Sequence, residues 1–289
     1  MAKAQSLFRD WLDVVLSGDA AVNALLLVLS GVVPLLLPLH TQDTPTVADG
    51  GAPYLRAGFL ASRQPQQQIV PTPALGAMIV VVSAVVQLGL SRADAVEQRR
   101  AAIAARLFGL AAAVSVCRAT TECLKLYVGY WRPYFYDVCT LDAQTGACDG
   151  ADDDAFKSFP SGHASLSMVA LFHASLCLAA ACRCGAPKRI GRGRCSADVG
   201  GIILMAAFAP AFLALWVAAT RVREHDHHPA DIVGGALLGA STAALFYYRY
   251  FPSIFHADAP VVLQPFRAAG DDDDQRRALR TNEDESESI

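Results

Sequence analysis

The sequence predicts an all-α integral membrane bundle of six transmembrane helices, with an N-terminal interfacial helix and a disordered acidic C-terminal tail. Of its 289 residues, 53% are hydrophobic and only 18% are charged, and the mean hydropathy is +0.32. An average soluble domain has about a quarter of its residues charged, so an ordinary soluble protein is excluded. The apolar runs, each close to the ~20 residues that cross a hydrocarbon core as a helix, are residues 20–39, 73–90, 101–125, 163–181, 197–219 and 229–248.

The two ends of the chain differ from this apolar middle. Residues 4–18 place apolar side chains at helical spacing opposite Arg9, Asp10 and Asp13, which predicts an interfacial helix. An extension of the first span is an equal alternative. From Arg267 the chain is rich in acids and serines, which predicts disorder. The expected units are an interfacial segment (1–19), a six-span domain (20–250) and a largely disordered tail (251–289).

The run 101–125 is the least hydrophobic of the six, because Arg118, Glu122 and Lys125 recur along one helical face. Ionisable groups within a span normally face the bundle interior or a water-filled cavity and mark function. The alternative is that they lie near the membrane surface and reach the headgroups, which suits Lys125 better than Arg118. His173, in the fourth span, is expected to be a packed core residue.

The last two spans carry residues that predict their shape and packing. Pro210 interrupts the apolar run 197–219 and predicts a kink. Gly235 and Gly239 lie four residues apart in the run 229–248 and form a small-xxx-small face. Such a face predicts close packing against a neighbouring helix.

Basic residues in two short loops predict the orientation in the membrane. Residues 91–100 and 183–195 connect successive spans and carry several arginines, which places them in the cytosol. With six spans both termini would also be cytosolic, and the remaining loops would face the lumen or the cell exterior. Cys139 and Cys148 lie in one of these outer loops and could form a disulfide across eight intervening residues.

Three polar stretches lie at the ends of spans. Residues 125–133 end the third span, residues 159–163 open the fourth, and residues 220–231 lie between the fifth and sixth. An even number of crossings separates the second stretch from the third, so the chain returns to the same membrane face. All three stretches are therefore expected on one side, whatever the absolute orientation.

The third stretch combines an arginine, a histidine and a carboxylate at useful spacing. Asp231 follows His227 by four residues and can hold its imidazole through Nδ1–H, which leaves Nε2 free to react. Pro229 suits the first position of the following helix and places Asp231 in its first turn. Arg221 is a permanent cation suited to forked hydrogen bonds with phosphate oxygens.

The three stretches together supply the residue types that phosphoryl transfer needs. Its transition state spreads charge over equatorial oxygens, so positioning and cations provide most of the catalysis. A glycine at a helix start lets backbone N–H groups approach those oxygens. Two histidines can divide the proton work, one neutral to attack phosphorus and one protonated to release the alkoxide. The residues suited to binding phosphate are Lys125, Arg132, Ser161, Gly162 and Arg221.

Other interpretations of the histidine-rich tract remain open at this point. Polar loops between hydrophobic helices are ordinary, and the tract itself, which holds His225, His227 and His228, could bind a metal in a transporter. A metal site would leave the cations of the first stretch without a role. We therefore expect no metal ligands in this tract.

Taken in order, the stretches have the forms K-x6-RP, PSGH and [S/T]-R-x5-H-x3-D. With them the chain resembles the type 2 phosphatidic acid phosphatase (PAP2) superfamily, and its span layout resembles the lipid phosphate phosphatase branch. The resemblance covers roughly residues 5–250, and three motifs in order are far more specific than one. It implies an all-helical membrane enzyme that dephosphorylates lipid phosphates without a metal or another cofactor.

The resemblance also implies roles for individual residues. His227 would be the nucleophile that forms a phosphohistidine, Asp231 its orienting partner and His163 the general acid for the leaving group. The phosphate would be bound by Lys125, Arg132, Ser161, Gly162 and Arg221. The sequence departs from the commonest family pattern at Thr220, at Glu224 and His225, and at Pro229. None of these departures affects a named role, but they leave the substrate preference open.

The expected function is metal-independent hydrolysis of phosphatidic acid to diacylglycerol, and of related lipid phosphates. Lysophosphatidic acid, sphingosine 1-phosphate and diacylglycerol pyrophosphate are the other expected substrates, and nothing suggests nucleic-acid binding. Alternatives are a phosphatase for isoprenoid diphosphates, lipid diphosphates or a soluble sugar phosphate, or a catalytically silent lipid-binding relative. The expected location is the endoplasmic reticulum or plasma membrane, with the active site on the lumenal or extracellular face and self-association left open.

Overall fold

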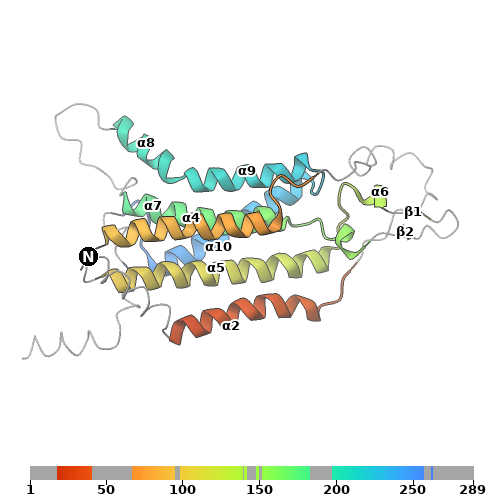
Figure 1. Ribbon diagram of the computed structural model, residues 1–289, viewed down its shortest axis with the longest axis horizontal. Helices are drawn as coiled ribbons and strands as arrows, with labels where there is room; N and C mark the ends of the chain where they lie inside the picture. The colour runs from red at the N-terminus through yellow and green to blue at the C-terminus, as the bar shows by residue number, and fades with distance from the viewer. Residues whose placement is uncertain are drawn as a thin grey trace, which may run out of the picture.

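Long helices running side by side make up most of the structure (Figure 1). The computed structural model describes residues 18–40, 67–94, 98–138, 140–141, 148–149, 152–182, 197–256 and 262. The helices are α2 (Gly18–Val32), η1 (Val33–Leu36), α4 (Thr72–Ala93), α5 (Arg99–Val128), α6 (Phe135–Val138), η3 (Asp153–Phe156), α7 (Gly162–Ala181), α8 (Ala197–Ala207), α9 (Ala209–Arg223) and α10 (Pro229–Tyr250). Two short strands, β1 (Thr140–Leu141) and β2 (Cys148–Asp149), pair antiparallel beyond the end of the bundle. The all-helical prediction is therefore confirmed.

Among the described residues, four helices are long and apolar enough to cross a membrane, namely α4, α5, α7 and α10. The helices α8 and α9 form a fifth candidate span, bent by 50° at a break next to Pro210. The kink predicted from this proline is thus present. At the predicted first span, α2 has 15 residues and η1 has four, so neither reaches spanning length. The described residues therefore show four or five candidate spans, and the expected total of six stays a prediction.

Several sequence predictions concern parts of the chain outside the described residues. Nearly all of the expected interfacial segment and almost the whole tail fall there, as does Cys139. Cys148 lies in β2, but its side chain is not described. The interfacial helix, the disordered tail and the disulfide therefore stay predictions.

The helix α7 is the centre of the bundle and contacts α4, α5, α9 and α10. Its most apolar stretch is 78% buried inside the protein, against 28% to 61% for the other three long helices. A Cβ atom on Gly235 would lie 2.6 Å from the Ser161 carbonyl oxygen, and one on Gly239 would collide with the Ser165 carbonyl oxygen. The close packing predicted from these glycines is therefore confirmed, and His173 is fully buried, as expected.

Four helix ends meet at one end of the bundle, on the right in Figure 1. The helix α5 ends at Gly129, whose φ of 59° lies in the left-handed region that glycine adopts at little cost. The helix α7 begins after Ser161, whose hydroxyl caps the backbone N–H of Ala164. A reciprocal pair of contacts between His228 and Asp231 caps the start of α10. These caps fix where the polar stretches leave the helices.

Candidate active site

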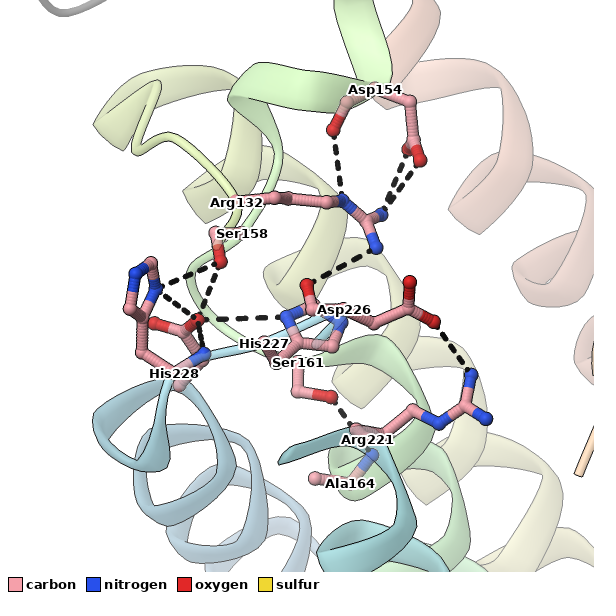
Figure 2. A network of polar contacts seen from close by, with 10 residues as sticks. Arg132, Asp154, Ser158, Ser161, Ala164, Arg221, Asp226, His227 and His228 are labelled. Atoms are coloured by element: carbon pink, nitrogen blue, oxygen red, sulfur yellow. Dashed lines mark hydrogen bonds and ion pairs between the residues drawn. The ribbon is translucent and has the colours of Figure 1, made fainter. Parts of the chain in front are cut away.

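The structure brings the three polar stretches together at this end of the bundle, as Figure 2 shows. Backbone hydrogen bonds tie the stretches to one another before any side chain is considered. The N–H of Ser158 donates to the carbonyl of Tyr130 at 2.9 Å, and the N–H of Ser161 donates to the carbonyl of Asp231 at 3.1 Å. These bonds join residues that are 28 and 70 positions apart in the sequence into one framework.

His227 and Asp231 lie as the four-residue spacing predicts. His227 is in the loop between α9 and α10, and Asp231 is in the first turn of α10. The Nδ1 atom of His227 lies 3.6 Å from Oδ2 of Asp231, and both side chains are buried. This separation is an electrostatic contact rather than a hydrogen bond. Such contacts are often long without substrate and tighten when it binds.

Burial also sets the protonation state of His227. Removal from water lowers the pKa of His227 below its ordinary value, because a charged imidazole is poorly solvated there. The neighbouring Asp231 carboxylate opposes this effect and raises the pKa of His227 in part. The net lowering keeps the imidazole neutral at neutral pH, which is the form that can attack phosphorus.

Ser158 is a functional candidate that the sequence motifs did not reveal. Its hydroxyl donates to Oδ2 of Asp231 at 2.5 Å, and both side chains are fully buried. The same carboxylate oxygen accepts the backbone N–H of His228 at 2.8 Å and contacts its Nδ1 at 3.3 Å. The His228 ring packs on Tyr130, with ring centroids 5.0 Å apart. Ser158 and His228 thus hold the carboxylate that faces His227.

His163 lies in the first turn of α7, close enough to Arg221 and His227 for their charges to act on it. Its imidazole hydrogen-bonds to the backbone of Val70, just before α4. Its Nε2 atom is buried and has no hydrogen-bond partner in the described part of the chain. A buried, unpaired ring nitrogen next to His227 suits an atom that exchanges a proton with substrate.

Arg221 lies in the last turn of α9 rather than in the loop that the sequence suggested. Its side chain is buried and pairs with two acids, Glu224 and Asp226. Its Nη1 atom lies 3.0 Å from Oδ2 of Asp226. Glu224 in turn accepts the backbone N–H of Ile69 at 2.6 Å, which attaches the segment before α4 to the site.

Arg132 and Lys125 reach the same region from the end of α5 and the loop that follows it. Arg132 pairs with Asp154 at 2.9 Å, and its Nη1 donates to the backbone carbonyl of Asp226 at 3.5 Å. Lys125 pairs with Glu122 at 3.1 Å. The Lys125 ammonium would lie 3.3 Å from a Cβ atom on Gly162, so this glycine leaves room for it.

No group of three or more histidine, cysteine or acidic residues is arranged to hold a metal ion within the part of the chain that the structure describes. The tract His225, His227 and His228 therefore does not form such a site. His227 and His228 instead turn toward Asp231.

Comparison with known proteins identifies the family. The model of the PAP2 superfamily matches residues 104–255, slightly more than half of the chain. The chain belongs to the PAP2 superfamily. The matched region contains all three motifs, so the resemblance seen in the sequence is confirmed. No solved structure matches the chain significantly.

Several curated relatives of this PAP2 chain carry phosphatase names. A probable diacylglycerol pyrophosphate phosphatase of Schizosaccharomyces pombe is 29% identical over 206 residues, which cover 67% of this chain and 69% of the relative. Lipid phosphate phosphatase 2 of Arabidopsis thaliana is 31% identical over 53% of each chain, so this protein spans about half of its length. Phospholipid phosphatase 2 of Mus musculus is 27% identical over 72% of this chain and 80% of the relative.

Proposed function

We propose that this protein is a lipid phosphate phosphatase that hydrolyses phosphatidic acid to diacylglycerol and acts on related lipid phosphates. The observation that carries the proposal is the buried pair His227 and Asp231, placed beside His163 and Arg221 at one end of a membrane bundle. We further propose that residues 20–250 form a six-span domain with both termini in the cytosol. The site would then face the lumen or the cell exterior.

The first chemical step forms a phosphohistidine. The Nε2 lone pair of neutral His227 attacks phosphorus, and the bond from phosphorus to the lipid oxygen breaks. Protonated His163 gives its proton to the departing lipid alkoxide, which leaves as an alcohol. The positive charge that develops on the His227 ring is stabilised by the Asp231 carboxylate next to Nδ1.

The second step returns the histidine to its starting state. Water attacks phosphorus, and His163, now neutral, accepts the proton that the water loses. The bond between phosphorus and Nε2 of His227 breaks, and inorganic phosphate is released. Throughout both steps the charge on the equatorial oxygens is balanced by cations and N–H groups. These groups belong to Lys125, Arg132, Ser161, Gly162 and Arg221.

A phosphatase for lipid diphosphates is the second candidate. Two of the relatives are named diacylglycerol pyrophosphate phosphatases, from fission and budding yeast. The site residues handle a terminal phosphate in the same way whether a lipid alkoxide or a phosphate leaves. The relative rates on phosphatidic acid and diacylglycerol pyrophosphate therefore distinguish the two candidates.

A substrate panel in detergent tests the proposal. Full-length protein should release phosphate from phosphatidic acid with a chelator present, and its rates on diacylglycerol pyrophosphate, an isoprenoid diphosphate and a soluble sugar phosphate rank the alternatives. His227→Ala should abolish release, while His225→Ala provides a matched histidine control in the same loop. Strict dependence on an added divalent metal, or full activity in His227→Ala, would refute the mechanism. No release from any substrate would instead favour a silent lipid-binding relative.

A further inference from the structure

Each cation assigned to the phosphate is already paired with a carboxylate in the structure. Lys125 contacts Glu122, and Arg132 contacts Asp154. Arg221 contacts two acids, one on each terminal nitrogen of its guanidinium group. An incoming phosphate must therefore share these cations with acids or displace the acids.

These acids differ in how easily they can move away. The side chains of Glu122 and Asp154 are 37% and 56% exposed, so they can turn to water at little cost. The two partners of Arg221 are Glu224 and Asp226, whose side chains are only 1% and 9% exposed. A buried carboxylate that separates from its cation becomes an uncompensated charge away from water, which is costly. These two acids therefore stay in place.

The two buried acids have different surroundings. Glu224 also accepts the backbone N–H of Ile69 at 2.6 Å, so it ties α9 to the segment before α4. Besides Arg221, the Asp226 carboxylate has only a long contact with Nε2 of Gln68, at 3.5 Å, among the hydrogen bonds described. Its backbone carbonyl faces Arg132, so Asp226 lies between the two arginine side chains (Figure 2). A phosphate bound by both arginines would therefore lie close to the negative charge of Asp226.

We propose that Asp226 is a specificity-determining residue that lowers the affinity of the site for the phosphate dianion. Its carboxylate neutralises part of the charge on Arg221 and repels a second negative charge on the ligand. Weak binding of the dianion would let inorganic phosphate leave readily after each turnover. The inference depends on one part of the proposed function, namely that Arg221 binds phosphate.

Direct binding of inorganic phosphate to the full-length protein in detergent tests this inference. Asp226→Asn removes the charge and keeps the shape, so it should tighten phosphate binding about 3- to 10-fold at low ionic strength. The gain should be larger at about pH 8, where phosphate is mostly a dianion, than at about pH 5.5, where it is mostly a monoanion. Asp226→Glu keeps the charge and should bind as the parent does.

Two further variants make the outcome decisive. Asp154→Asn removes an exposed acid from Arg132 and should tighten binding less than Asp226→Asn does. If Asp226→Asn does not fold, Asp226→Ala provides the same charge removal. Unchanged or weaker phosphate binding in a folded neutral variant overturns the inference, provided that Arg221→Gln weakens binding. If the parent binds no phosphate, or Arg221→Gln has no effect, the phosphate assignment of the proposed function fails as well.

Discussion

His227 is the residue whose protonation state decides whether the proposed chemistry can begin. Burial lowers its pKa and Asp231 raises it, with burial the stronger influence. The imidazole therefore stays neutral at neutral pH and gains a proton only in acid. The rate constant kcat/KM should fall as the pH drops through this lowered pKa, below the ordinary value of about 6.5.

Replacing the Asp231 carboxylate separates its effect on the pKa of His227 from the effect of burial. Asp231→Asn removes the group that raises the pKa, so the acid limb of the profile of kcat/KM against pH should move to lower pH. The maximum rate should also fall, by about 10²- to 10⁴-fold, because the ring loses its orienting partner. The measurement is the pH profile of phosphate release for both proteins. An acid limb that moves to higher pH would contradict the account.

Ser158 should act through Asp231 rather than on the substrate. Ser158→Ala removes one strong hydrogen-bond donor from a buried carboxylate oxygen of Asp231. The free energy of unfolding should fall by about 1–3 kcal/mol. We expect kcat to fall about 10-fold or more with little change in KM, and Ser158→Thr, which keeps the hydroxyl, to recover most of the rate. Steady-state kinetics on folded protein measure this split. A change confined to KM, or no recovery in Ser158→Thr, would show that the hydroxyl has another role.

The elements of the fold were predictable where a residue type has a local consequence. Pro210 predicted the bend between α8 and α9, and the glycines of α10 predicted its close contact with α7. The end of α9 was predicted too early, because Val222 and Arg223 continue the helix past the apolar run. The segment before α4 was missed, since its contacts to Glu224 and His163 use backbone atoms of Ile69 and Val70, which have no sequence signature.

The helix contact between α7 and α10 can be tested with alanine. In Gly235→Ala the new methyl group would lie 2.6 Å from the Ser161 carbonyl oxygen, and the helices would have to separate. A loss of about 1–3 kcal/mol in the free energy of unfolding is expected, together with lower activity because Ser161 shifts. Thermal unfolding in detergent measures the loss.

Gly76 provides the matched control for this substitution. It lies inside α4, and nothing comes within 4 Å of the Cβ atom that Gly76→Ala would add. Alanine has the higher helix propensity, so this variant should be as stable as the parent or slightly more stable. Equal loss of stability in both variants would mean that the close contact between the helices is not responsible.

At the scale of the whole molecule, the order of the motifs along the chain anticipated their meeting at one end of the bundle. An even number of crossings between the second and third stretch was enough to place them on one side. The individual side-chain contacts could not be predicted from the order of the motifs. The contact between Ser158 and Asp231 spans 73 residues, and it depends on how far α7 and α10 slide along each other.

The proposed topology is a property of the full chain and can be tested by added glycosylation sites. The sequence has no Asn-x-Ser/Thr acceptor of its own. An acceptor inserted at residues 142–147 should be glycosylated, because we propose that this loop faces the lumen or the cell exterior. An acceptor at residues 183–195 should remain unmodified, as should tags at both ends. The reverse pattern would place the active site in the cytosol.

Covalent trapping of the phosphorylated protein tests the central claim most directly. Full-length protein mixed briefly with radiolabelled phosphatidic acid and quenched in alkali should carry label that is lost in acid, as phosphohistidine is. Mass spectrometry should locate the phosphate on His227, and His227→Ala should carry none. Turnover without a labelled protein intermediate, or label on another residue, would contradict the account.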